Sequence, residues 1–285
     1  MLTGTRIAVS LLFLSRPLGY ARPMSASSLF SCTGIRIEVS GRTLVDALDF
    51  EAQRGELLAI LGRNGAGKTL TLHTLAGLRS AAAGQVSVEG HDVFSAKRQE
   101  VARRLALLPQ HVDDIFPATV LDTAMIGRHP HIGRFQWESP DDIAIGQEAL
   151  AAVDLGGLAR RDVLTLSGGE RRRLAIAQVL TQQPDVYLLD EPTNHLDPQH
   201  QLDALRLFRD KADAGAAVIA SLHDANLAVR YADRCLLLYG DGRWDIGPTD
   251  EVLREECLTE LYSTTMEAVD WRGTRLFVAS GDVAP

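Results

Sequence analysis

The sequence predicts an α/β fold in which buried strands lead into loops that carry polar, chemically active residues. Two uninterrupted apolar runs, residues 57–61 and 186–189, are typical of strands that are buried on both faces. The first run is followed by a glycine-rich loop and then by LTLHTLAGL, which favours a helix. The second run ends in two carboxylates, Asp190 and Glu191. This order of strand, loop and helix is the unit that α/β domains repeat.

The composition excludes several classes of protein. The chain has 285 residues, which corresponds to about two domains or to one large α/β domain with an insertion. A hydrophobic content of 46% excludes disorder, and three widely separated cysteines exclude a disulfide scaffold and favour free thiols in a reducing compartment. No stretch reaches the ~20 apolar residues that cross a bilayer. The net charge of −8 argues against nucleic acid as the main partner.

The N-terminal segment differs from the remainder in charge. Residues 1–37 contain four arginines and no acidic residue, so their +4 leaves −12 for the rest of the chain. Residues 7–14 form an apolar run after a positive start, which is compatible with a secretory signal, whereas the arginine- and serine-rich composition suits a transit peptide. A third alternative is translation from Met24. We therefore treat residues 1–34 as an extension and expect the folded domain to begin at residue 35.

The loop GRNGAGKT at residues 62–69 matches the pattern G-x-x-x-x-G-K-[ST] in the required strand–loop–helix setting. Its glycines allow a tight turn in which successive N–H groups point at phosphate oxygens, and the following helix adds its positive N-terminus. Lys68 is expected to neutralise the β- and γ-phosphates, and the Thr69 hydroxyl to ligate Mg²⁺. The predicted nucleotide-binding residues here are Gly62, Arg63, Asn64, Gly65, Ala66, Gly67, Lys68, Thr69 and Thr71.

The two carboxylates at the end of the second strand have different expected roles. Asp190 can hold Mg²⁺ directly or through its water, and Glu191 can orient and deprotonate the water that attacks the γ-phosphate. Solvated acids at a strand end are common when they occur alone. Together with a phosphate loop they predict a nucleotide-hydrolysing site.

Between these two motifs lies LSGGE, residues 166–170, followed by a basic and then apolar helix. At this point the sequence resembles the ATP-binding subunits of ABC transporters, over about residues 35–262. The resemblance implies a P-loop NTPase of the ABC type, with a RecA-like core, an antiparallel β subdomain and an inserted α-helical subdomain at about residues 111–175. Ser167 is also a favourable helix N-cap. The resemblance implies that Ser167, Gly168, Gly169 and Glu170 close on the γ-phosphate held by the other subunit of a head-to-tail dimer.

The resemblance assigns roles to four further residues. Gln110 matches the loop that touches Mg²⁺ or water and faces the membrane subunit, and Asp197 lies in NHLD, which matches a loop crossing the dimer interface. His223 matches the histidine that hydrogen-bonds the γ-phosphate. Val39 stands where the family normally has an aromatic residue that stacks on adenine, so aliphatic contact would replace stacking.

The remaining segments are predicted mainly from their own residue patterns. DDIAIGQEALAAVDL in the insertion has apolar residues at helical spacing. Upstream of it, His129, His131, Phe135 and Trp137 could suggest a metal or aromatic site, but we expect them to pack the subdomain or line a groove for the partner. We expect a short strand at residues 44–50 and a helix from Asp250. Residues 263–285 are predicted to form one short strand and a tail.

These features, with the resemblance to ATPases of importers for iron-siderophores, haem or cobalamin, predict an ATP-hydrolysing subunit that uses ATP and Mg²⁺. The expected partners are a second copy of the chain, membrane permeases and, indirectly, a substrate-binding protein. The expected location is peripheral, on the cytoplasmic face of the inner membrane. The alternatives are a non-transport ABC ATPase and an ATP-binding regulatory subunit.

Overall fold

The computed structural model describes residues 28–111, 117–133 and 135–280. The first layer is an antiparallel sheet with the strand order β2-β1-β4-β5. Its long strands pair because alternate side chains of each face the interior. The strand bounds are β1 Ser28–Val39, β2 Arg42–Gln53, β4 Ala83–Val88 and β5 His91–Asp92.

This sheet begins earlier than the sequence predicts. β1 starts at Ser28, so residues 28–34, which we assigned to the extension, belong to the folded domain. Phe30 and Cys32 are almost completely buried, and Phe30 stacks on Phe50 of β2. A bulge near Gly34, which has a φ of +61°, shifts the register and interrupts the alternation that marks the strand in the sequence. The three alternatives for the N-terminal segment fall on residues 1–27, outside the described residues.

The second layer is a six-stranded sheet in the order β10-β9-β3-β8-β7-β6, in which every pairing is parallel except that of β10 with β9. The two predicted buried strands, β3 and β7, lie near its centre with β8 between them. Parallel register brings the carboxyl ends of these strands to one edge of the sheet, where their loops meet. The bounds are β3 Leu57–Gly62, β6 Leu105–Leu108, β7 Val186–Asp190, β8 Ala217–Ser221, β9 Arg234–Leu238 and β10 Trp244–Pro248.

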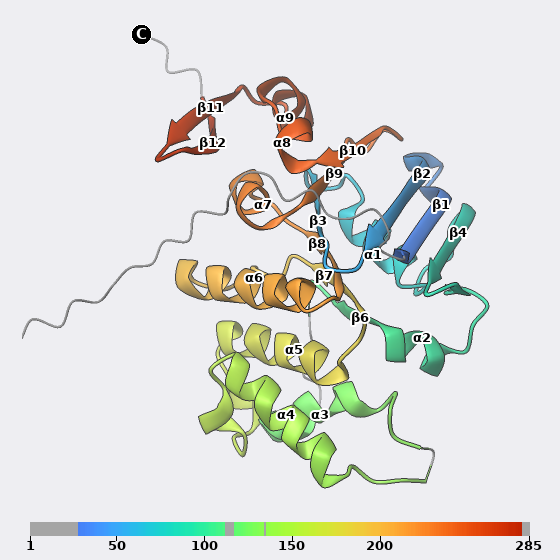
Figure 1. The fold of residues 1–285 in the computed structure, drawn as a ribbon, viewed down its shortest axis with the longest axis vertical. Coiled ribbons are helices and arrows are strands. Elements are labelled where there is room, and N and C mark those ends of the chain that lie inside the picture. Colours follow the sequence, from blue (N-terminus) through green and yellow to red (C-terminus); the bar gives the residue numbers. More distant parts are fainter. Residues whose placement is uncertain (1–27, 112–116, 134, 281–285) are drawn as a thin grey trace, which may run out of the picture.

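The central sheet is covered on both faces, which explains its continuous apolar strands. Leu58 and Ile60 of β3 pack with the antiparallel sheet and α1, whereas Leu57, Ala59 and Leu61 pack into a second core with the helices of the other face. Figure 1 shows α5 and α6 on that second side and the β1–β2–β4 sheet on the first. The helix bounds are α1 Lys68–Leu75, α2 Arg98–Arg104, α5 Gly168–Gln182, α6 Pro198–Asp213 and α7 Ala225–Tyr231.

A helical subdomain is inserted between β6 and β7. It contains α3 Val120–Met125, α4 Pro140–Ala152 and the first part of α5, with short 3₁₀ turns between them. The predicted insertion ends at about residue 175, within α5, which runs without interruption to Gln182 and so joins the insertion to the core as one continuous helix. Within the described ranges, no helix is both long and apolar enough to cross a membrane.

The C-terminal part forms α8 Thr249–Val252, α9 Glu255–Tyr262 and a hairpin of β11 Met266–Trp271 and β12 Thr274–Ala279. The predicted single helix from Asp250 is therefore two helices, and the predicted single strand is a pair. Arg272 and Gly273 have φ values of +54° and +77°, as a two-residue hairpin turn requires. In Figure 1 this hairpin and the helical subdomain lie at opposite ends of the molecule.

The burial of Phe30 gives a direct test of where the domain begins. Phe30→Ala should lower the free energy of unfolding by about 3–5 kcal/mol, because it leaves a cavity against Phe50. Phe135, 91% exposed, is the matched control, and Phe135→Ala should change stability by less than about 0.5 kcal/mol. Urea titration of both variants measures the difference. Equal stabilities would place residues 28–34 outside the domain.

Candidate functional site

The predicted functional loops meet at the carboxyl edge of the parallel sheet. The phosphate loop follows β3, Gln110 follows β6, Glu191 follows β7, and His223 follows β8. Together they line a cavity of about 490 Å³. Its lining residues are Arg63, Asn64, Gly65, Gly67, Lys68, Thr69, Leu70, Gln110, Glu191, Asn194 and His223.

The phosphate loop has the tight backbone that its glycines predict. Gly65 and Gly67 have φ values of +83° and +99°, which side chains rarely tolerate, and Gly67 is the N-cap of α1. Lys68 is only 5% exposed and its Nζ donates to the carbonyl oxygens of Gly62, at 2.8 Å, and Arg63, at 3.4 Å. Burial lowers the pKa of Lys68, while the nearby carboxylates Glu191 and Asp190 raise it. The loop therefore surrounds the buried Lys68 ammonium group, whose charged form the neighbouring carboxylates favour.

Asp190 is completely buried and only half satisfied. Its Oδ1 accepts a hydrogen bond from the Ser221 hydroxyl at 2.7 Å, and the same hydroxyl accepts one from the N–H of Glu191 at 2.9 Å. Its Oδ2 has no hydrogen-bond partner among the described residues. A buried carboxylate oxygen without a partner is costly unless a cation or water satisfies it.

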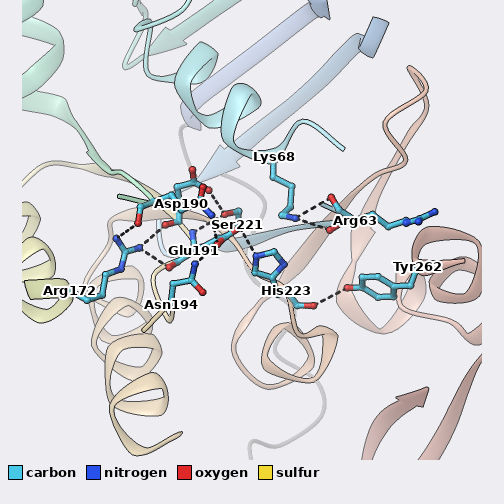
Figure 2. A network of polar contacts seen from close by, with 11 residues as sticks. Arg63, Lys68, Arg172, Asp190, Glu191, Asn194, Ser221, His223 and Tyr262 are labelled. Atoms are coloured by element: carbon cyan, nitrogen blue, oxygen red, sulfur yellow. Dashed lines mark hydrogen bonds and ion pairs between the residues drawn. The ribbon is translucent and has the colours of Figure 1, made fainter. Parts of the chain in front are cut away.

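Glu191 is the centre of the polar network in Figure 2. Its Oε2 accepts from the side-chain amides of Gln110, at 2.7 Å, and Asn194, at 2.5 Å, and its Oε1 lies 2.5 Å from His223 Nε2. The residue is 6% exposed, yet it lines the cavity beside Lys68 and Thr69. A buried carboxylate aimed into a cavity next to a phosphate loop is in position to act on a water molecule there.

The LSGGE segment occupies a different surface. Ser167 caps α5 by accepting from the N–H of Glu170, and Glu170 accepts from the N–H of Ser167, which lowers the pKa of Glu170. Ser167 and Gly168 are exposed, and Gly169 lies close to the carbonyl oxygen of His195. The 490 Å³ cavity contains none of these residues in its described lining. The chain thus presents the phosphate loop and the start of α5 as two separate surfaces.

Besides the LSGGE residues, the described lining of the cavity lacks six predicted residues: Gly62, Ala66, Asp190, Thr71, Val39 and Asp197. Thr71 is fully buried, because helical geometry turns its side chain toward the core while Leu70 lines the cavity. The Thr71 hydroxyl has no partner among the described residues. Val39 is half-buried at the end of β1 and is not among the cavity-lining residues described above. Asp197 is the exposed N-cap of α6 and bonds the backbone N–H and Nδ1 of His200, which lowers the pKa of Asp197.

The structure adds residues that the sequence analysis did not assign to the site. Asn194 and Ser221 contact the two carboxylates directly. The end of α9 also reaches the site, because Tyr262 donates to the carbonyl of His223 at 3.3 Å (Figure 2). Ser263 accepts a hydrogen bond from Arg63 at 2.7 Å. Asn194 begins the NHLD segment and Ser221 lies two positions before His223, but no motif assigned their side chains to the carboxylates. Tyr262 is 39 positions from His223 and Ser263 is 200 from Arg63, so no local pattern marks these two contacts.

The histidine and aromatic residues of the insertion do not converge. His131 bonds the carbonyl of Gln182, and burial lowers the pKa of His131. Phe135 and Trp137 are 91% and 90% exposed, so packing within the subdomain does not explain them. Across the part of the chain that the structure describes, no cluster of three or more His, Cys, Asp or Glu residues could hold a metal.

Comparison with known protein families agrees with this geometry. The family model described as ABC transporter matches residues 45–194, which include the phosphate loop, LSGGE and both carboxylates. The chain belongs to the ABC transporter family. It is an ATP-binding subunit of that family and an ATPase, which confirms the predicted fold class and activity.

Several relatives carry specific names. A hemin import ATP-binding protein of Streptomyces coelicolor is 41% identical over 89% of this chain and 90% of its own length. A cobalamin import ATP-binding protein of Halobacterium salinarum is 40% identical over 79% of this chain and 56% of its own length. A solved structure described as a metal-chelate type ABC transporter in an inward-facing conformation is 28% identical, with a TM-score of 0.79, over 90% of this chain and 99% of that one.

The Ser221 hydroxyl forms hydrogen bonds with both carboxylate-bearing residues, the Asp190 carboxylate and the Glu191 N–H. Ser221→Ala should destabilise the fold by about 1–3 kcal/mol, because it leaves Asp190 Oδ1 and the Glu191 N–H buried without that partner. Ser87→Ala is the control, because the Ser87 hydroxyl also has a side-chain hydrogen-bond partner, the Ser31 hydroxyl, but at a part-buried position. Thermal unfolding of both variants tests this. A larger loss for Ser87→Ala would contradict the assignment.

Proposed function

We propose that this chain is the ATP-hydrolysing subunit of an importer that moves a metal chelate, such as haem, an iron-siderophore or cobalamin, through separate membrane permeases. The observation that carries the hydrolytic part is the position of Glu191, buried and held by three side chains in the cavity that the phosphate loop lines. The direction and cargo are supported by the hemin and cobalamin import relatives and by the metal-chelate type transporter.

The proposed mechanism assigns a step to each part of the cavity. Lys68 and the loop N–H groups bind the β- and γ-phosphates of ATP, and the buried ammonium gains the anionic partner that its burial requires. Glu191 takes a proton from the attacking water as the base. Gln110 and Asn194 fix the Glu191 carboxylate, and His223 stands at its other oxygen, where it can donate to the γ-phosphate.

The donor set fits Mg²⁺. Asp190 Oδ2 is buried without a described partner, and the Thr69 hydroxyl and the Gln110 amide both line the cavity. Mg²⁺ in phosphoryl-transfer sites is held by one or two carboxylates, substrate phosphates and several waters, so this sparse protein set suits it. Asp190, Thr69 and Gln110 would hold the ion, which would neutralise charge on the transferring phosphate.

We further propose that two copies assemble head to tail. The exposed helix start at Ser167 and Gly168 is an anion-binding surface that its own cavity does not use. A second copy could place this surface on the γ-phosphate, with Asp197 of the D-loop near the contact. Membrane permeases would dock beside Gln110 and the helical subdomain, where Phe135 and Trp137 are exposed, which would hold the subunit at the cytoplasmic face of the membrane.

Glu191→Gln tests the proposed base. The amide keeps the shape of the side chain but cannot take a proton, so turnover should fall by about 10²–10⁴-fold while ATP affinity changes little. Steady-state phosphate release and nucleotide titration measure the two effects. Glu148→Gln, at an exposed position of α4, should leave both unchanged. Undiminished hydrolysis by Glu191→Gln would show that another group is the base.

Mixing two inactive variants tests the head-to-tail dimer. Lys68→Ala should disable the phosphate loop, and Ser167→Arg should block the start of α5. In a mixed dimer one site combines both intact surfaces, so an equal mixture should regain about a quarter of parental ATPase activity. If each site lay within one chain, the mixture would stay inactive.

A further inference from the structure

We propose that Arg172 is a positioning residue for hydrolysis, through which the helix that begins at LSGGE sets the orientation of both Glu191 and Gln110. The proposal rests on the proposed role of Glu191 as the base. Arg172 lies in the second turn of α5, and its side chain enters the core rather than solvent, with only 5% of the residue exposed. Figure 2 shows its guanidinium directed at the residues of the β7 loop.

The guanidinium bonds the backbone at the ends of two neighbouring strands. Its Nη2 donates to the carbonyl oxygens of Asp190 and Glu191, at 2.6 and 2.7 Å. Its Nη1 donates to the carbonyl oxygen of Pro109 at 2.6 Å and lies 3.4 Å from that of Gln110. Because β6 and β7 are paired parallel strands, these carbonyls emerge side by side where the ladder ends and need other donors. One planar side chain supplies them for both loops.

The backbone conformation of Glu191 is unfavourable and depends on hydrogen bonds such as the one from Arg172. Its φ is +49°, a left-handed conformation that is unfavourable for a residue with a side chain. The peptide groups on either side are fixed by Ser221, which accepts from the Glu191 N–H, and by Arg172 and the Asn194 N–H, which donate to the Glu191 carbonyl. This conformation aims the carboxylate at the cavity, so the bonds of Arg172 help to hold the base in its working direction.

Arg172 also remains charged in spite of its burial. Desolvation lowers the pKa of Arg172 to about 10, while Asp190 and Glu191 raise it, so the group is a cation at neutral pH. A buried cation next to two buried carboxylates offsets their mutual repulsion. Since α5 starts at the proposed signature surface, a shift of this helix would move Pro109 and Glu191 together. The geometry therefore links the helical subdomain to the hydrolytic carboxylate within one chain.

The test compares Arg172→Met and Arg172→Lys with the parent, using ATPase kinetics, nucleotide titration and thermal unfolding on the full chain. Arg172→Met should lower kcat by about 10- to 100-fold with little change in KM or ATP affinity, because a misdirected base slows chemistry and the phosphate loop still binds ATP. Arg172→Lys keeps the charge and single donors and should recover part of kcat. Arg209→Met is the control: Arg209 is a half-buried arginine that also donates to a backbone carbonyl, but it bonds Gly55 and Asp233 away from the cavity.

Two outcomes would overturn the proposal. One is an Arg172→Met variant that folds and keeps kcat within about twofold of the parent, since misplacing a base costs far more. The other is an equal loss of kcat in Arg209→Met, which would mean that lost stability alone is responsible. Glu191→Gln, assayed in parallel, separates this proposal from the proposed function: if it retains turnover, the role of Glu191 fails, and if only Arg172→Met retains turnover, the positioning role alone fails.

Discussion

The site depends on one constraint: a carboxylate must be held aimed into a cavity while it is almost completely buried. Glu191 meets this constraint through two amide donors, a histidine and a backbone fixed on both sides. Gln110 follows β6, Ser221 and His223 lie at the end of β8, and Asn194 lies in the loop after β7 that carries Glu191 itself, so the alignment of the parallel sheet brings these groups together. The antiparallel layer and the helices cover the two faces of that sheet and keep it in register.

The same arrangement explains why the chain presents two functional surfaces instead of one complete pocket. The cavity holds the Lys68 ammonium group and the Glu191 carboxylate, beside an Asp190 oxygen that has no partner among the described residues, while the start of α5 is an exposed, capped helix N-terminus. In the proposed mechanism both surfaces bind phosphate for the same physical reason, the partial positive charge at a helix N-terminus. Arg172 joins them through the protein interior, because it lies on the helix that starts at one surface and bonds the loops that form the other.

The sequence predicts those parts of the site that depend on local patterns. The phosphate loop, the strand that ends in Asp190 and Glu191, and the capped helix at Ser167 each combine a residue type with a neighbouring element. Two of the contacts at Glu191 were not predictable from local patterns, because Gln110 lies 81 positions away and the Ser221 hydroxyl 30. Thr71 is buried outside the cavity lining, because the motif does not give the rotation of the helix that follows it. The start of β1 was missed because a bulge interrupts its alternation.

The central claim is that a complete hydrolytic site forms between two copies of this chain. Cysteines at Asn64 in the phosphate loop and Gly168 at the start of α5, with Cys257 replaced by serine, test it by cross-linking under mild oxidation. Both positions are exposed, and a side chain at Gly168 meets nothing within 4 Å. The account predicts a disulfide-linked dimer that forms with ATP and is much weaker without it. A cross-link within a single chain, or no dimer in the presence of ATP, would contradict it.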